Sequence, residues 1–161
     1  MSKSNRLLLL ISIITLAFIS CSKSDWKHFF DHHKKDVVSA RNLPLTGSQE
    51  VPEKITPASG KVDVRYNLKT KKLEFTLSWK ELTGIPTGAH IHGTAARGSN
   101  AGIKYDFFDL IPKTTSGTFS NSVTVDGIAI KEDSLLLGYY YFNMHTPTNP
   151  GGEIRGQIEF D

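Results

Sequence analysis

Apolar and polar residues alternate strictly along residues 61–68 and again along residues 72–79. A period of two is typical of a β-strand that has one face in the core and the other in water. The residues between these runs, Lys-Thr-Lys-Lys at 69–72, predict a turn, so we expect a two-stranded hairpin. The side chains expected on its core face are Val62, Val64, Tyr66, Leu68, Leu73, Phe75, Leu77 and Trp79.

Three later segments have the composition of further strands. Residues 116–125, 136–145 and 153–160 are rich in β-branched and aromatic residues and are bounded by Gly, Pro or Asn. Only residues 128–137 leave room for a short helical turn. Short strands at this spacing predict an all-β fold, either an antiparallel Greek-key-like β-sandwich or a flattened barrel. Residues 43–161, about 120 in number, match the usual size of one domain with one core.

The alternation also predicts which side chains point away from the core. Along residues 89–92, Ala89 and Ile91 take the core face, so His90 and His92 point outward. In the two later strands, the core face is expected to carry Tyr140, Phe142, Met144, Ile154, Ile158 and Phe160. The opposite face is expected to carry Tyr139, Tyr141, Asn143, His145, Glu153, Arg155 and Gln157.

Three of the outward residues are histidines with the spacing of metal ligands. His90 and His92 flank a single residue, so on a strand their imidazoles project from one face, roughly 6.5–7 Å apart. If His145 approaches from its own strand, three neutral nitrogen donors surround one point, as one copper or zinc ion requires. The alternative is that the three rings hydrogen-bond loop backbone and one another, and so fasten the Asn-Pro-Gly-Gly turn at 149–152 onto the sheet. The sequence leaves both interpretations open.

Arg155 and Glu153 follow that glycine-rich turn and also have two interpretations. The planar guanidinium of Arg155 can clamp a carboxylate or sulfate of a ligand, or it can hold Glu50 or Glu153 and fix a loop. Glu153, Asn143 or backbone carbonyls are candidates to orient the second ring nitrogen of each histidine.

The N-terminus predicts export and lipid anchoring. Lys3 and Arg6 precede the apolar residues 7–20, a run too short for a membrane-spanning helix and typical of an export signal. The residues Phe18-Ile19-Ser20-Cys21 resemble the lipobox of bacterial lipoproteins, which implies cleavage before Cys21 and attachment of diacylglycerol to its thiol, with palmitate as a fatty acid of the lipid. We therefore expect a lipoprotein signal peptide at residues 1–20, the acylated cysteine and a flexible tether at 21–42, and the β-rich domain at 43–161.

Charge and cysteine content narrow the class of protein. Loss of residues 1–20 removes two of the 19 Lys and Arg residues and no acid, which leaves 17 basic against 16 acidic residues, a net charge of +1. There is no basic stripe, so we expect no nucleic-acid partner. Cys21 is the only cysteine, so the folded domain has no internal disulfide.

Ordered motifs along the whole domain resemble the CHRD domain, first described in chordin. They include Leu45-Thr-Gly-Ser-Gln-Glu-Val-Pro52, Gly88-Ala-His-Ile-His-Gly93, Tyr141-Phe-Asn-Met-His-Thr146 and Asn149-Pro-Gly-Gly-Glu-Ile-Arg-Gly-Gln157. The resemblance implies an exported β-rich module without an established activity. It does not imply the growth-factor ligand of chordin.

A more limited similarity links the histidines to copper,zinc superoxide dismutases. Those enzymes also have a His-X-His pair on one strand, a later copper-ligating histidine and an arginine after a Gly-rich loop, the order in which His90, His92, His145 and Arg155 occur here. No histidine lies between His92 and His145, so the bridging ligand and the zinc-ligand set are missing. The similarity therefore implies a mononuclear copper or zinc site rather than a two-metal dismutase.

Two functional interpretations follow. The first is a non-catalytic CHRD-domain binding module of the cell envelope, anchored by lipid in the outer membrane on its periplasmic or surface face, with an extracytoplasmic protein or polymer as partner. The second is a mononuclear copper- or zinc-binding protein that uses His90, His92 and His145 and has redox activity as a further option. The sequence favours a protein that is not an enzyme, because no Ser-His-Asp order, P-loop or nucleotide fingerprint is present.

Overall fold

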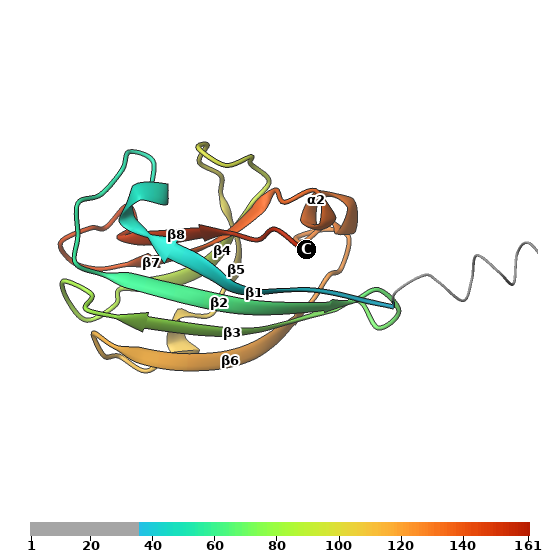
Figure 1. Ribbon diagram of the computed structural model, residues 1–161, viewed down its shortest axis with the longest axis horizontal. Helices are drawn as coiled ribbons and strands as arrows, with labels where there is room; N and C mark the ends of the chain where they lie inside the picture. Colours follow the sequence, from blue (N-terminus) through green and yellow to red (C-terminus); the bar gives the residue numbers. More distant parts are fainter. Residues whose placement is uncertain (1–35) are drawn as a thin grey trace, which may run out of the picture. The chain divides into compact units, whose positions relative to one another are not determined.

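The two alternating segments form the predicted hairpin in the computed structural model, which describes residues 36–161 (Figure 1). Strand β2 (Ser59–Asn67) pairs with β3 (Lys72–Lys80), and Asn67 lies opposite Lys72 across the turn. The Asn67 side chain shapes this turn, because its Oδ1 accepts hydrogen bonds from the backbone N–H groups of Lys69 and Thr70. Seven of the eight expected core residues are buried, and Leu68 is half-buried against them.

The eight strands within residues 36–161 belong to one antiparallel sheet, which confirms the predicted all-β fold. Besides β2 and β3, the strands are β1 (Val37–Thr46), β4 (Gly88–Gly93), β5 (Ile103–Asp106), β6 (Gly117–Thr124), β7 (Tyr140–His145) and β8 (Ile154–Gln157). Their order in the sheet is β5-β4-β7-β8-β1-β2-β3-β6. Three pairs of neighbours, β3 with β6, β4 with β7 and β1 with β8, are therefore distant in sequence.

The sheet curls into two layers around one core and nearly closes. Strands β1, β2, β3 and β6 form one layer, and β8, β7, β4 and β5 form the other (Figure 1). Phe75 of β3 meets Phe142 of β7 across the core, with ring centroids 4.9 Å apart. The two edge strands are joined by side chains, because the Asn121 amide of β6 donates a 3.0 Å hydrogen bond to the Tyr105 hydroxyl of β5.

Two strands were not anticipated. Strand β1 begins at Val37, inside the segment 21–42 assigned to the tether, and its residue Ala40 is 1% exposed in the core. A register shift between Ala40 and Leu43, with Asn42 at a φ of 54°, interrupts the period of two, so no continuous alternating pattern runs along this strand. Strand β5 has only four residues at an edge of the sheet and is mostly exposed, so its alternation is too short to recognise.

Helical structure is confined to short connections among the described residues. The helix α2 (Glu132–Leu136) lies inside the segment 128–137 expected to carry a helical turn. Two 3-10 turns, η1 (Gly47–Gln49) and η2 (Phe108–Leu110), follow β1 and β5. Within residues 36–161, no helix has the length and apolar character needed to cross a membrane. The predicted signal peptide and Cys21 lie outside the described residues.

Loops cover the outward face of β4, β7 and β8, and this cover creates the second buried region of the domain. The side chains of Asn143, Arg155 and Gln157 point away from the hydrophobic core, yet they are 3%, 1% and 2% exposed. The loop after β4 reaches the loop after β1, where the Asn100 amide donates to the Val51 carbonyl at 2.9 Å. Polar side chains on this face are therefore shielded from water although they do not belong to the apolar core.

Candidate metal-binding site

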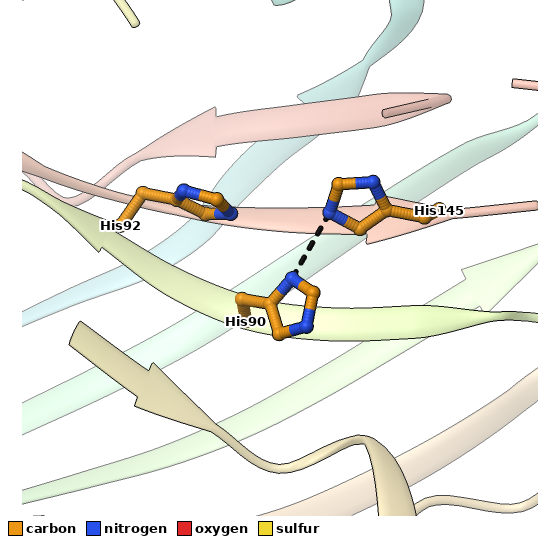
Figure 2. Close-up of side chains that lie close together, drawn as sticks. All are labelled: His90, His92 and His145. Atoms are coloured by element: carbon orange, nitrogen blue, oxygen red, sulfur yellow. Dashed lines mark hydrogen bonds between the residues drawn. The ribbon is translucent and has the colours of Figure 1, made fainter. Parts of the chain in front are cut away.

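The pairing of β4 with β7 brings the three histidines together (Figure 2). His90 lies opposite Asn143 and His92 opposite Tyr141, while His145 lies opposite Gly88 at the start of β4. Because residues 88, 90 and 92 share one face of the strand, His145 meets the two β4 histidines on that face. The ring centroid of His90 is 5.4 Å from that of His92 and 4.8 Å from that of His145.

One nitrogen of each ring points toward a common centre. These three ligand atoms all lie within 4.8 Å of one another. The closest pair, His90 Nδ1 and His145 Nε2, is 3.0 Å apart and hydrogen-bonded (Figure 2). His92 Nε2 is buried and has no hydrogen-bond partner among the described residues. A buried ring nitrogen without a partner is costly, and a bound metal ion would satisfy it.

Backbone carbonyls orient two of the rings. Nδ1 of His92 donates to the carbonyl of Ala101 at 2.9 Å, and Nδ1 of His145 donates to the carbonyl of Pro150 at 2.9 Å. Because these nitrogens carry the protons, the Nε2 atoms of both rings present lone pairs to the centre. Of the acceptors proposed from the sequence, backbone carbonyls fill this role here, and neither Glu153 nor Asn143 does.

The third ring, that of His90, has two available tautomers. Since Nε2 of His145 is an acceptor, Nδ1 of His90 donates the hydrogen bond between them in the metal-free chain. Nε2 of His90 is 3.7 Å from Oδ1 of Asp106, an exposed carboxylate on β5. A proton on this Nε2 would be attracted to Asp106 and would free Nδ1 for a metal ion. The sequence offered no signal for Asp106, because its strand was not anticipated.

Burial keeps all three imidazoles neutral. Burial, followed by the neighbouring charge of His145, lowers the pKa of His90 from 6.5 to about 4. Burial is also the main cause that lowers the pKa values of His92 and His145. Neutral rings are the form that binds metal, so few protons have to be displaced at neutral pH.

Gly88 provides the space in which two of the rings meet. A Cβ atom at this position would lie 2.8 Å from Cε1 of His90 and 2.9 Å from Cδ2 of His145, closer than carbon atoms approach. The absence of a side chain at Gly88 therefore allows the rings of His90 and His145 to approach from neighbouring strands.

Arg155 lies beside the histidines but fixes a loop rather than holding a carboxylate. Its guanidinium donates to the Ser99 carbonyl at 2.8 Å and to Asn100 Oδ1 at 3.3 Å. Its Cζ atom is 3.4 Å from the ring centroid of Tyr141. Within the described residues, neither Glu50 nor Glu153 is within ion-pair distance of it. Arg155 therefore fixes a loop, one of the two roles considered from the sequence, but through uncharged groups and not through either carboxylate.

Glu50 is a second buried ionisable group on this face. It is 5% exposed, and its Oε1 accepts a 2.7 Å hydrogen bond from the Asn143 amide. Burial raises the pKa of Glu50 from 4.5 to about 7, and the nearby positive charge of Arg155 offsets part of that rise. Gly152, at a φ of 127°, is required beside this pair because a Cβ would lie 2.6 Å from Glu50 Oε1.

Glu153 connects three loops through a fully buried carboxylate. Its oxygens accept hydrogen bonds from the hydroxyls of Thr56, Thr83 and Thr146 and from the backbone N–H of Thr83, at 2.5 to 3.1 Å. These hydrogen bonds lower the pKa of Glu153 although burial by itself would raise it. Because Thr146 follows His145 directly, this carboxylate also holds the end of β7 in place.

Fold and site together define a single-domain antiparallel β protein with a histidine cluster beneath surface loops. The sequence matches the family model of the CHRD domain over residues 42–158. The chain belongs to this family, as the ordered motifs indicated. No curated protein and no solved structure matches the chain significantly.

Proposed function

We propose that this CHRD domain binds one copper or zinc ion through His90 Nδ1, His92 Nε2 and His145 Nε2. The observation that supports the proposal best is the convergence of three neutral imidazoles, two of which are oriented by backbone carbonyls. Metal-binding histidines ordinarily have such a partner on the second ring nitrogen.

The dimensions of the cluster fit a metal ion. A metal–nitrogen distance of about 2.0–2.1 Å in a tetrahedral site places ligand nitrogens roughly 3.3 Å apart. The three nitrogens are already within 4.8 Å of one another, so small side-chain rotations would complete the site. Copper(II) is the tightest binder of nitrogen sites among divalent first-row ions, and zinc accepts the same ligands.

Three protein ligands leave a further coordination position for water or a small ligand. The His90 side chain is 11% exposed, so solvent reaches the edge of the site. This openness is compatible with redox activity toward a small molecule if the bound ion is copper. The buried Arg155 is bound by the Ser99 and Asn100 loop, which argues against its use as a guide for an incoming anion.

Elemental analysis tests the proposal. The full chain, expressed with copper and zinc supplied and purified with detergent, is expected to retain about one metal ion per chain. His90→Ala and His145→Ala are expected to abolish this retention, because two imidazoles leave too few protein ligands. His28→Ala is the control, since His28 precedes the CHRD domain at residues 42–158, and it is expected to keep the metal. A metal-free wild-type chain, or loss of metal in His28→Ala alone, would contradict the assignment.

A second candidate function is a non-catalytic envelope module in which the histidines fasten loops. The hydrogen bond between His90 and His145 favours this role, because it joins β4 to β7 without a metal ion. Under this interpretation the purified chain contains no metal, and its melting temperature does not change when a chelator is added.

We also propose that Cys21 anchors the protein by lipid in the outer membrane of the cell envelope, where it meets an extracytoplasmic protein or polymer. The lipobox-like residues before Cys21 support this proposal. In cells fed radioactive palmitate, the wild-type chain is expected to carry the label and sediment with membranes. Cys21→Ala is expected to lose the label, because no other thiol is available. A labelled Cys21→Ala protein would place the lipid elsewhere.

A further inference from the structure

A buried positive charge lies beside the three histidines, on the side of His92. Arg155 is 1% exposed, and its hydrogen bonds go to uncharged groups: the Ser99 carbonyl, Asn100 Oδ1 and Gln157 Oε1. An arginine side chain keeps its proton even when burial lowers its pKa, as it does here. The outward face of β8 therefore holds a fixed positive charge without a paired carboxylate.

Tyr141 places this charge next to the histidine cluster. The guanidinium carbon of Arg155 is 3.4 Å from the Tyr141 ring centroid. The same ring is stacked on His92, with centroids 5.0 Å apart and planes inclined by 4°. One aromatic ring thus separates the buried cation from a proposed metal ligand, and because all three side chains are buried, solvent screens the interaction only weakly.

Other charged groups near the cluster oppose Arg155 only weakly. The carboxylate of Glu153 is buried on the same face, but its charge is shared among hydrogen bonds from Thr56, Thr83 and Thr146. Glu153 is not among the charges that shift the pKa values of the three histidines, whereas Arg155 lowers the pKa of His92.

Asp106 is close to His90, but its side chain is 62% exposed and solvent screens its charge. The carboxyl of Glu50 is buried and close to its midpoint of titration at neutral pH. Arg97, which adds positive charge near Arg155, is paired with Glu159. The three ligands are themselves neutral, so no anionic ligand compensates the charge of a bound ion.

We propose that the buried charge of Arg155 makes the three-histidine site bind monovalent copper in preference to divalent copper. The site then stores copper as Cu(I) or acts as a one-electron centre of raised reduction potential. This inference rests on the proposed metal-binding function. A positive charge repels Cu(II) with twice the energy with which it repels Cu(I). Reduction of bound Cu(II) by one electron from an external donor such as ascorbate relieves half of that repulsion, and no covalent bond to the protein is changed.

The size of the effect follows from Coulomb's law. A unit charge about 10 Å from the metal, at an effective dielectric constant of about 20, changes a binding constant on the order of tenfold for each unit of metal charge. Removing the charge of Arg155 should therefore lower the ratio of Cu(I) to Cu(II) affinity by roughly tenfold, which corresponds to a reduction potential about 59 mV lower.

The test compares two substitutions that disturb the same contacts and differ in charge. The affinity of the full chain for Cu(I) is measured against a Cu(I)-specific chelator in ascorbate, and the affinity for Cu(II) against a Cu(II) chelator, at mildly acid pH where Glu50 is mostly neutral. Arg155→Gln is neutral, whereas Arg155→Lys keeps the charge. Any loss of folded protein lowers both affinities by one factor, so it cancels in their ratio.

We expect the affinity ratio to fall roughly tenfold in Arg155→Gln and to stay within about threefold of wild type in Arg155→Lys. The control Arg41→Gln, at an exposed position of β1, should leave the ratio unchanged. An unchanged ratio in Arg155→Gln, or an equal fall in Arg155→Lys, overturns this inference while copper binding itself stands. A wild-type chain that binds no copper overturns the proposed function and this inference together.

Discussion

Replacing Glu153 with alanine is expected to lower the free energy of unfolding by roughly 3–5 kcal/mol, the largest effect we expect from any substitution outside the hydrophobic core. The carboxylate is 0% exposed and accepts hydrogen bonds from Thr56, Thr83 and Thr146, which belong to three different loops. Alanine would leave the buried hydroxyl of Thr146 without this acceptor and would remove the shared acceptor that joins the loops of Thr56 and Thr83. Urea denaturation monitored by tryptophan fluorescence measures the loss.

Glu74→Ala is the matched control for this substitution. Glu74 also accepts a hydrogen bond, from Arg65 at 2.8 Å, but both side chains are about half exposed. A solvent-exposed ion pair contributes at most about 1 kcal/mol, so the control should unfold nearly as the wild type does. Equal losses in both variants would show that the buried carboxylate does not hold the loops together.

Copper is expected to stabilise the folded chain strongly. A ligand present at about a thousand times its dissociation constant, and bound only by the folded state, raises the free energy of unfolding by about 4 kcal/mol. For a domain of this size we therefore expect the melting temperature to rise by roughly 10 °C or more. The reason is structural, because the ion would join β4 to β7 through His90, His92 and His145. Thermal melting with and without copper measures the shift.

Two controls separate binding at the site from nonspecific binding. Adding a chelator to the copper-loaded chain should return the melting temperature to its metal-free value. The melting temperature of His145→Ala should be the same with and without copper. A copper-dependent rise that persists in His145→Ala would mean that the ion stabilises another part of the molecule.

Most of the fold follows from periodicity, and the exceptions have physical causes. The hairpin of β2 and β3 was predicted with its core residues, because both strands have one face in the core and one in water. Strand β1 was missed because a bulge near Asn42 shifts its period. Strand β5 was missed because its four residues at the sheet edge are too few to show a period. The pairing of β1 with β8 depends on contacts over more than 100 residues, which no local pattern encodes.

The sequence identified the three histidines and the face on which they lie, but not the details of their surroundings. Alternation around Ala89 and Ile91 gave their direction, and the structure brings His145 to them through the register of β7. The backbone carbonyls of Ala101 and Pro150 were not specified, because every residue has a carbonyl and only the loop path selects one. The contact between Tyr141 and Arg155 was also missed, since both had been assigned only to the outward face.

The side-chain contacts between the two edges of the sheet affect how the domain can recognise a partner. The Asn121 to Tyr105 hydrogen bond and the stacking of Phe107 on Phe119, with centroids 5.9 Å apart, link β6 to the β5 region. A foreign peptide that added itself as a ninth strand would have to break these links first. Recognition by strand addition is therefore disfavoured, and neighbouring copies of the domain are protected from joining into a continuous intermolecular sheet.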